Sequence, residues 1–432
     1  MKKIFLQTYG CQMNEYDSEL VRSVLLQAGY SFVDTAQAAD VILVNTCSVR
    51  ENATRKVLGL LQKIRHDKNG QPAIYGILGC MATSLKETLL ADPHVHVDLL
   101  AGPDSYRRLP ELIRQTAQKG SFDTALSDTE TYEDIYPDRI SSVNAWIAIM
   151  RGCNNFCSYC VVPYARGRER SRSAESIIEE THRLAEEGFK QVTLLGQNVN
   201  SYRHGSTDFP RLLDEVSRVG GLERVWFTSP HPKDVPDELI GLIADNPRIC
   251  NHIHLPLQSG NTSVLKKMNR PYSKEQYLKL VDKIRARCPQ AAVTTDIIVG
   301  FPTETDRQFE DTVDVFKTVG YDSAFIFKYS PRPHTAASRH FPDDIPEEVK
   351  TARIMQLNDL QKSHALRCNT ALIGTVKDVL VEKSMHADGE GRTIENKRVR
   401  FSSLKNDILA GDILPVRIEQ ATPHLLKGSP AA

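Results

Sequence analysis

The sequence predicts an α/β protein built from an amino-terminal open parallel sheet domain, a central barrel of six strand–helix units and a small carboxy-terminal β-barrel. Three observations predict this class. The chain has 432 residues, which is more than one ordinary domain contains. Short apolar runs of strand length alternate with helix-like stretches over about the first 370 residues. The rest of the chain changes to short strand-like runs separated by glycine-rich turns.

The amino-terminal segment, residues 1–120, contains three strand-like apolar runs, each followed by a helix-like stretch. Such alternation is typical of a parallel sheet with right-handed crossovers. The predicted strands are 3–8, 40–45 and 73–78, and the predicted helices are 14–28, 51–68 and 83–91.

Each of these predicted strands is followed by a cysteine, namely Cys11, Cys47 and Cys80. The carboxyl ends of the strands in an open parallel sheet lie at one edge, and ligands bind there. We therefore expect three thiols from distant parts of the sequence to form one three-cysteine metal site. The alternative is three buried thiols without a metal, because free cysteine is among the most buried residue types.

The central segment, residues 139–369, restarts the alternation after a weakly patterned, acidic stretch at 121–138, which is expected to be a linker, with a packed strap as the alternative. Six strand–helix units predict a partial TIM-like barrel, with the chemistry in the loops at the strand ends. A long amphipathic helix is expected from Pro346 to about Asn369. The predicted strands are 145–150, 191–195, 224–228, 252–255, 293–299 and 324–328, and the predicted barrel helices are 174–187, 209–219, 236–245, 274–287 and 306–319.

The loop after the first of these strands carries Cys153, Cys157 and Cys160. It supplies three sulfurs and no fourth ligand. A structural zinc site is closed by four protein ligands, whereas a catalytic metal keeps one position open. Zinc, an iron–sulfur cluster and no metal are the three alternatives, and the missing ligand favours a cluster with one open iron.

The spacing CxxxCxxC, with an aromatic residue just before the last cysteine, resembles the radical S-adenosylmethionine (SAM) superfamily. This resemblance implies a 4Fe-4S cluster on the three loop cysteines, with SAM bound to the open iron. It also implies SAM contacts from the polar strand-end loops, although capping and turn roles explain single residues there equally well. The candidate SAM contacts are Tyr159, Gln197, Asn198, Gln258, Ser259, Gly300 and Phe301.

The segments around Cys11, Cys47 and Cys80 resemble the amino-terminal domain of the methylthiotransferases, which carries an auxiliary 4Fe-4S cluster from which sulfur is delivered. Residues 9–18, 47–53 and 160–171 look like the MiaB type of this family, which converts prenylated adenosine beside the tRNA anticodon to its 2-methylthio form. The resemblance implies an enzyme with two 4Fe-4S clusters and SAM. Its implied partners are the tRNA anticodon loop, a flavodoxin- or ferredoxin-like electron donor and a sulfur source or cluster carrier.

Arginine occupies alternate positions directly after the second cysteine triad, at Arg166, Arg168 and Arg170. On an extended segment these side chains would lie on one face. A run of charge is usually only a solvated surface. Because this run adjoins the expected mouth of the site, we predict that the three arginines contact RNA phosphates.

The carboxy-terminal segment, residues 370–432, predicts a compact OB-like β-barrel. Its expected strands are 373–382, 397–401 and 414–419, separated by glycine-rich turns such as 388–391. The segment resembles the TRAM module, which binds RNA. Arg392 and Arg398, with Lys397 and Arg400, are its candidate phosphate contacts.

Composition excludes some classes of protein and leaves others open. Lys+Arg and Asp+Glu both total 54, so the global charge does not identify a partner. No apolar run approaches the roughly 20 residues that span a bilayer, and the first strand begins without room for a leader peptide. Nine cysteines in such a chain argue against a disulfide framework. We expect a cytoplasmic monomer that binds no membrane.

Two other functions are compatible with the sequence. Within the same class of enzyme, the substrate could be a threonylcarbamoyl-modified adenosine in tRNA or an aspartate of a ribosomal protein. In a different class, the chain could be an RNA-binding module with structural zinc at its cysteines.

Overall fold

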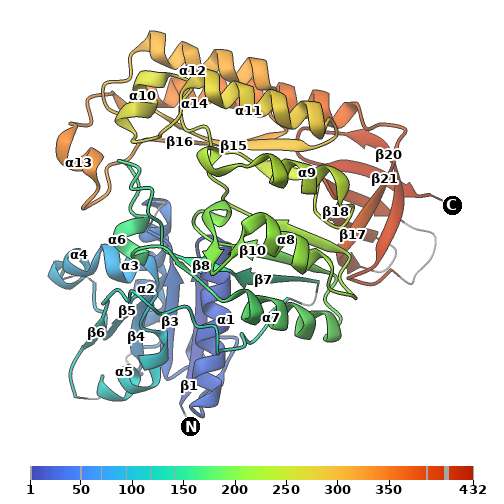
Figure 1. The fold of residues 1–432 in the computed structure, drawn as a ribbon. Coiled ribbons are helices and arrows are strands. Elements are labelled where there is room, and N and C mark those ends of the chain that lie inside the picture. The colour runs from blue at the N-terminus through green and yellow to red at the C-terminus, as the bar shows by residue number, and fades with distance from the viewer. Residues whose placement is uncertain are drawn as a thin grey trace.

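The computed structural model describes residues 2–48, 51–69, 71–93, 95–116, 118–141, 143–385, 388–402 and 408–431. Val49 and Arg50, which belong to the motif at 47–53, lie outside the described residues. The chain forms an amino-terminal parallel sheet, a half-barrel of six parallel strands and a closed carboxy-terminal barrel (Figure 1). The predicted fold class is therefore confirmed.

The amino-terminal sheet has six parallel strands in the order β2-β1-β3-β4-β5-β6. All six residues of β3 are buried, as expected for a central strand covered on both faces. Helices α1 and α5 cover one face, and α2, α3 and α4 cover the other. The strands are β1 (Lys3–Tyr9), β2 (Ser31–Phe32), β3 (Val41–Thr46), β4 (Ile74–Leu78), β5 (Leu99–Ala101) and β6 (Ser121–Asp123), and the helices are α1 (Gln12–Gln27), α2 (Glu51–Asp67), α3 (Cys80–Ser84), α4 (Lys86–Ala91) and α5 (Leu109–Gln115).

The segment predicted as a linker packs against the amino-terminal domain. Its first three residues form β6 and extend the sheet. Further along, the Tyr132 side chain is fully buried, donates a hydrogen bond to the carbonyl of Pro103 at 3.0 Å and stacks on Tyr106. Arg22 pairs with Asp138 at 2.7 Å. These contacts make residues 124–138 a packed strap.

The half-barrel consists of two three-stranded parallel sheets, β7-β10-β13 and β14-β15-β16. A parallel bridge between Val225 and Ile249 lies where the two sheets approach each other. The helices pack outside and bury one large apolar core against the strands. The strands are β7 (Asn144–Ala148), β10 (Gln191–Leu195), β13 (Arg224–Phe227), β14 (His252–His254), β15 (Ala292–Val299) and β16 (Ser323–Lys328), and the main helices are α7 (Ala174–Glu186), α8 (Phe209–Ser217), α9 (Asp237–Asp245), α11 (Lys274–Arg287) and α12 (Asp306–Val319).

Local sequence signals fix where several of these helices begin. Ser273 and Thr305 each accept a hydrogen bond from the third residue of the helix that follows, and Gln276 and Gln308 complete the two capping boxes. Shorter elements fill the connections. These are β8 (Met150–Arg151), α6 (Val162–Arg166), β9 (Arg170–Ser171), β11 (Arg203–His204), β12 (Thr207–Asp208), α10 (Thr262–Lys267) and α13 (Ala336–His340).

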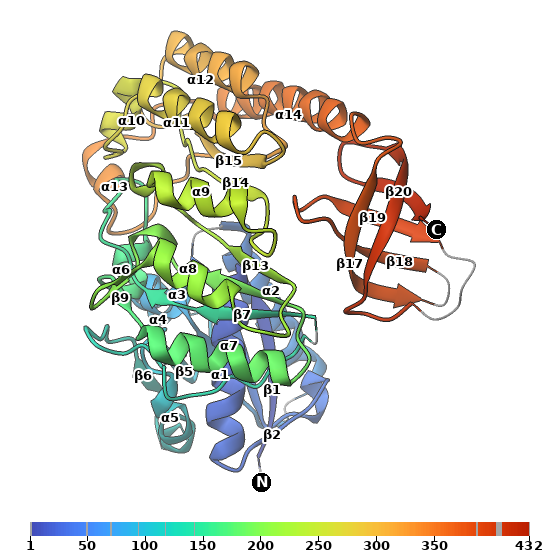
Figure 2. The same cartoon turned by 45° about the vertical axis from the view of Figure 1, so that its right-hand side comes forward.

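Helix α14 (Glu347–Thr370) leads from the half-barrel to the carboxy-terminal barrel (Figure 2). This barrel closes in the order β17-β18-β19-β21-β20 around a small apolar core. Glycine-rich residues 388–391, predicted as a turn, form part of β18 instead. A Cβ at Gly391 would lie 2.0 Å from the Leu380 carbonyl oxygen, so glycine permits the close strand pairing. The strands are β17 (Val376–Met385), β18 (Asp388–Arg392), β19 (Arg398–Ser402), β20 (Ile413–Ala421) and β21 (Leu426–Pro430).

The carboxy-terminal barrel is anchored at the amino-terminal ends of the half-barrel strands. Arg224, the first residue of β13, donates to the carbonyls of Arg392 and Asp378 at 2.7 and 2.8 Å. Lys397 pairs at 2.6 Å with Asp322, the residue before β16. The module therefore lies at the end of the half-barrel opposite the strand-end loops.

Candidate cofactor and RNA site

The first cysteine triad lies at one edge of the amino-terminal sheet. Cys11, Cys47 and Cys80 follow the carboxyl ends of β1, β3 and β4, which are consecutive neighbours in the sheet. Cys11 is the N-cap of α1, Cys47 donates its backbone N–H to Tyr9 at 3.1 Å, and Cys80 opens α3. The parallel register thus brings together three residues that are far apart in the sequence.

The surroundings act differently on the thiols of this triad. A hydrogen bond from the Cys47 thiol lowers the pKa of Cys11 to about 6, so Cys11 is mostly thiolate near neutral pH. Burial raises the pKa of Cys80, and the neighbouring Arg166 guanidinium acts in the opposite direction. Arg166 also donates from Nε to the Cys80 sulfur at 3.1 Å.

The second triad lies in the loop between β8 and α6. Gly152 has φ of 77°, and a Cβ there would lie 1.9 Å from the Arg168 carbonyl oxygen. Only glycine therefore fits the close approach that places Cys153 beside the returning chain. Ser158 ties the loop to α10, because its hydroxyl donates to the Lys267 carbonyl at 2.7 Å. The loop is thus held at two points, at Gly152 and at Ser158.

The three loop thiols affect one another electrostatically. Burial raises the pKa of Cys160 to about 12, and negative charge at Cys157 adds to this shift. Burial likewise raises the pKa of Cys153. Arg270 donates to the Cys157 sulfur at 3.6 Å. A cationic metal centre would remove this mutual repulsion, so the donor set fits a thiolate-bound cluster.

No three His, Cys, Asp or Glu side chains among the described residues are arranged as ligands of one ion. In a 4Fe-4S cluster each cysteine binds a different iron. Both triads consist of sulfur donors alone, which suit iron–sulfur clusters better than they suit magnesium or calcium.

The seven residues predicted to contact SAM fall into two groups. Gln197 and Asn198, after β10, each keep a buried amide oxygen without a hydrogen-bond partner among the described residues. The other five contact the rest of the protein. Tyr159 and Phe301 pack in one hydrophobic cluster, and Gln258 forms a parallel bridge with Ile297 of β15. The Ser259 hydroxyl accepts a hydrogen bond from the Asn261 backbone, and the Gly300 backbone donates to the Glu304 carboxylate.

The sequence did not single out His231 as a ligand-binding residue. It is 5% exposed at the end of β13, its Nδ1 accepts from the Lys233 backbone, and its Nε2 has no partner among the described residues. Burial lowers its pKa to about 2, so the ring is neutral at pH 7. His231 therefore joins Gln197 and Asn198 as a polar group without a protein partner at the strand ends.

The predicted RNA-contacting arginines are placed differently from the expectation. Arg166 and Arg170 are buried, and they pair with Asp17 at 2.7 Å and Asp104 at 2.9 Å. Their charges are thus neutralised inside the protein. The prediction that Arg166 and Arg170 contact RNA phosphates does not agree with this burial. Arg168 is exposed and lies 4.4 Å from the ring centre of Phe156.

The cationic side chains of the carboxy-terminal barrel lie on its surface. Arg392 pairs with Glu382 at 3.1 Å, and Arg400 pairs with Glu390 at 2.9 Å. Arg398 shares the Glu390 carboxylate. Such exposed pairs are weak and open readily. Lys397, by contrast, is used in the contact with the half-barrel.

An aromatic face lines the inside of the half-barrel. In the register of β15 and β16, Asp296 is opposite Phe325 and Ile298 is opposite Phe327. The two phenylalanines are 53% and 37% exposed, which is unusual for such large apolar side chains. His254 contacts the edge of Phe325 and pairs with Asp296 at 3.3 Å. We call Phe325, Phe327 and His254 the aromatic face.

A half-barrel of six parallel strands with a three-cysteine loop after its first strand defines a radical SAM enzyme. The Radical SAM superfamily model matches residues 147–316, and the model of the uncharacterised protein family UPF0004 matches residues 3–102. Membership of this superfamily implies a 4Fe-4S cluster and SAM as cofactors.

Curated relatives match the whole chain. tRNA-2-methylthio-N(6)-dimethylallyladenosine synthase of Azobacteroides pseudotrichonymphae is 46% identical over 441 residues, which cover 100% of this chain and 97% of the relative. The synthases of Phocaeicola vulgatus and Porphyromonas gingivalis strain W83 are 45% and 46% identical, cover 99% of this chain, and are themselves covered to 95% and 94%. The chain belongs to the family of tRNA-2-methylthio-N(6)-dimethylallyladenosine synthases.

Solved structures share the fold at low sequence identity. The radical SAM methyltransferase TsrM from Kitasatospora setae aligns with a TM-score of 0.57 at 16% identity, over 78% of this chain and 75% of that chain. The cobalamin-dependent radical SAM enzyme OxsB aligns with a TM-score of 0.55 at 12% identity, over 84% and 56%. These likenesses concern the fold alone.

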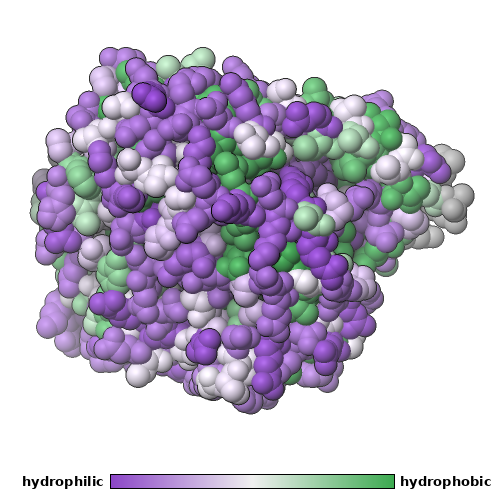
Figure 3. All heavy atoms as spheres, turned by 45° about the horizontal axis from the view of Figure 1, so that its top comes forward, coloured by the Kyte–Doolittle hydropathy of each residue, from purple (hydrophilic) through white to green (hydrophobic). Residues whose placement is uncertain are grey.

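Two properties of the surface complete the description. Hydrophilic residues cover most of the face seen when the upper helices come forward (Figure 3). In the described part of the chain, no helix combines the length and the apolar character that crossing a membrane requires.

Proposed function

We propose that the protein is a radical SAM methylthiotransferase that replaces hydrogen by a methylthio group at C2 of a prenylated adenosine beside the anticodon of tRNA. Full-length similarity to the synthase family supports the substrate class. The observation that carries the proposal is the first cysteine triad. An enzyme that only used the radical would not require Cys11, Cys47 and Cys80 beside the barrel loop that holds Cys153.

Each triad has a separate role in this proposal. Cys153, Cys157 and Cys160 would hold the cluster that binds SAM, and Cys11, Cys47 and Cys80 would hold an auxiliary 4Fe-4S cluster. When bound, these groups supply homolytic cleavage of SAM and the sulfur that is transferred. The amide oxygens of Gln197 and Asn198 and the His231 Nε2 are buried polar atoms that can orient the polar groups of SAM.

The chain itself must receive and orient the adenine. A base that leaves the RNA stack is commonly held by aromatic side chains. The aromatic face supplies Phe325 and Phe327 as exposed apolar rings, and His254, held by Thr294 and Asp296, packs against the edge of Phe325. The prenyl group adds apolar area to the substrate, which further favours contact with the two phenylalanines over contact with a charged surface.

Arginines that are exposed or partly exposed are suited to hold the RNA backbone. Arg168 lies after the second triad, and Arg392, Arg398 and Arg400 lie on the carboxy-terminal barrel. Phosphate contacts can replace the weak surface pairs with glutamate, because phosphate offers several acceptor oxygens to one guanidinium.

The remaining parts of the proposal concern organisation and partners. Residues 1–120 with β6 form the auxiliary-cluster domain, 139–369 the radical SAM core and 370–432 the RNA-binding TRAM module, with the strap between the first two. The enzyme acts as a monomer in the cytoplasm, where tRNA is found. A flavodoxin- or ferredoxin-like protein supplies the electron, and a sulfur donor or cluster carrier restores the transferred sulfur.

Anaerobic reconstitution tests the proposal. We expect a brown protein with about eight iron atoms per chain, of which about four are lost in the Cys11→Ala/Cys47→Ala/Cys80→Ala variant. Mass spectrometry should find the methylthio product on a prenylated anticodon hairpin and not on a hairpin with threonylcarbamoyladenosine. The triple variant should still cleave SAM without forming product. Colourless protein with stoichiometric zinc would refute the proposal in favour of an RNA-binding module.

A further inference from the structure

We infer that Asp17 positions the two cysteine triads relative to each other, because its carboxylate holds both ends of the Cys153–Cys160 loop against the domain of Cys11, Cys47 and Cys80. The inference rests on the proposed function, since it requires two clusters to serve one substrate. Asp17 acts through arginines and does not contact a cofactor. It is therefore a positioning residue.

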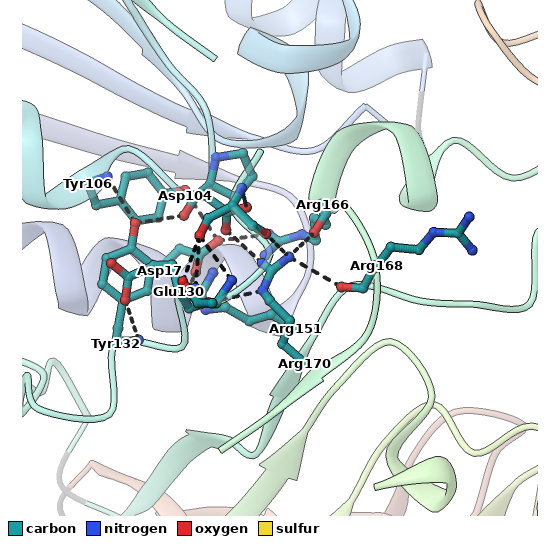
Figure 4. Close-up of polar contacts among 12 residues, drawn as sticks. Asp17, Asp104, Tyr106, Glu130, Tyr132, Arg151, Arg166, Arg168 and Arg170 are labelled. Carbon is teal, nitrogen blue, oxygen red and sulfur yellow. Dashed lines mark hydrogen bonds and ion pairs between the residues drawn. The ribbon is translucent and has the colours of Figure 1, made fainter. Parts of the chain in front are cut away.

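The contacts form one continuous chain of hydrogen bonds (Figure 4). Arg151 Nη2 donates to Asp17 Oδ1 at 2.7 Å, and Arg166 Nη2 donates to Asp17 Oδ2 at 2.7 Å. The same Arg166 guanidinium donates from Nε to the Cys80 sulfur at 3.1 Å. Asp17 and Arg151 are 0% and 1% exposed, so water does not compete for these bonds.

The positions of these residues in the sequence show which parts of the protein the hydrogen bonds connect. Arg151 lies just before the loop and Arg166 just after it, and Asp17 lies on α1, the helix that Cys11 caps. One carboxylate therefore ties both ends of the second triad's loop to an element of the first triad. A shift of α1 would move both ends of the loop together.

The surroundings restrict Asp17 further. The Tyr106 hydroxyl donates to Asp17 Oδ2 at 3.3 Å, and the Arg151 guanidinium carbon lies 4.6 Å from the ring centre of Tyr132. Tyr132 belongs to the strap, so the strap also packs against an arginine that binds this carboxylate. Tyr106 thus adds a third hydrogen bond to the carboxylate, and Tyr132 packs against one of its two arginines.

The network is costly as a means of stabilisation alone. Arg151 Nε and Nη1 and Arg166 Nη1 are buried without a hydrogen-bond partner among the described residues. Buried charges with incomplete hydrogen bonding are weak contributors to stability, and well-packed apolar residues can replace them. Directional bonds from one carboxylate to two arginines do what apolar packing cannot do, since they fix geometry.

The matched pair of variants is Asp17→Asn and Glu19→Gln. Glu19 lies on the same helix, is 4% exposed and pairs with Arg139 at 2.8 Å. Both substitutions thus remove one buried negative charge of α1 that faces an arginine of another segment. Only Asp17 connects to the loop ends and to Cys80. A general loss of domain packing should therefore affect both variants, and a positioning role should affect Asp17→Asn alone.

Two readouts are measured on reconstituted protein with the iron content of the wild type. Pulsed electron paramagnetic resonance reports the magnetic interaction between the two reduced clusters, and we expect it to weaken in Asp17→Asn and to stay unchanged in Glu19→Gln. The second readout is methylthio product formed per SAM cleaved. We expect this ratio to fall at least ~10-fold in Asp17→Asn, because misplacement by about 1 Å can reduce a rate 100-fold, while SAM cleavage changes less than ~3-fold.

Arg166→Lys is a second test if Asp17→Asn does not fold. The lysine keeps the charge but has one donor atom, so it cannot reach Asp17 and Cys80 together. It should reproduce both effects. Unchanged cluster interaction and coupling in the folded variants would overturn the inference, as would equal losses in Glu19→Gln. Wild-type protein that holds two interacting clusters but forms no methylthio product would refute the proposed function and leave the positioning measurement interpretable.

Discussion

Removal of the two phenylalanine rings of the aromatic face tests how the substrate base is received. In the double variant Phe325→Ala/Phe327→Ala, a bound base and its prenyl group would lose their apolar partners. The two side chains are 53% and 37% exposed. With about 200 Å² per phenylalanine, covering them removes roughly 180 Å² from water, which corresponds to an upper value of about 4.5 kcal/mol at 25 cal/mol per Å². Alanine substitution of stacking residues typically costs about 1–3 kcal/mol per base. We therefore expect a rise in Kd of about 5- to 150-fold.

The assay is fluorescence anisotropy with a labelled anticodon hairpin, prenylated or unprenylated, at one fixed salt concentration. The wild type should bind the prenylated hairpin more tightly, and the double variant should bind both hairpins equally. Phe122→Ala is the control, because Phe122 is 39% exposed on β6 of the amino-terminal domain. Undiminished preference for the prenylated hairpin in the double variant would refute the assignment of the aromatic face to the base.

Three further predictions concern other parts of the molecule. Gly152→Ala places a Cβ 1.9 Å from the Arg168 carbonyl oxygen at a φ of 77°, so the second triad should lose its cluster, about four iron atoms per chain. The control Gly29→Ala, also at positive φ but with open space around the Cβ, should keep its iron. Arg224→Ala removes two hydrogen bonds to carbonyls of the carboxy-terminal barrel. Each hydrogen bond to a charged group contributes about 1.5–3 kcal/mol, so the attachment of the barrel should weaken. Limited proteolysis should therefore cleave near α14 faster in Arg224→Ala than in the control Arg218→Ala. His231, with a pKa lowered to about 2 by burial, stays neutral in the folded chain, whereas the unfolded chain takes up a proton below pH 6.5. Stability to urea of the iron-free protein should thus fall as pH decreases from 6.5, by up to about 1.4 kcal/mol per pH unit from this group, and His231→Asn should show a smaller slope.

The placement of the cysteines at the strand ends could be predicted from the sequence because it depends on local pattern. Apolar runs of strand length fixed where β1, β3 and β4 end, and the parallel order then determined that Cys11, Cys47 and Cys80 share one edge. The spacing within 153–160 is likewise local. Neither inference needed knowledge of which side chains meet across the fold.

The burial of Arg166 and Arg170 could not be predicted because it depends on contacts between distant segments. Asp17 lies 134 residues from Arg151 and 149 residues from Arg166. No local pattern marks it as the partner of two arginines, and an alternating arginine run has the same appearance whether solvated or buried. A signal was present, since Asp17 lies among the apolar positions of α1, Tyr16 and Leu20. A charge on the buried stripe of a helix requires a buried partner.

Glycine misled the prediction for the same reason. Residues 388–391 have the composition of a turn. In the closed barrel, a Cβ at Gly389 would lie 2.4 Å from the Phe401 ring. The glycines therefore make room for a neighbouring strand, and only the assembled barrel reveals that requirement.

In the proposed function, the attachment of the carboxy-terminal barrel at the start of β13 and β16 sets a minimum length for the RNA. The longest half-barrel strand, β15, has eight residues, about 26 Å at 3.3 Å per residue. An RNA gripped by that module and inserted at the cysteine loops must bridge this height. A hairpin with too few base pairs below the loop would reach the cysteine loops but not the carboxy-terminal barrel. Shortening the stem step by step should therefore reveal a sudden drop in affinity at the length where contact with the barrel is lost.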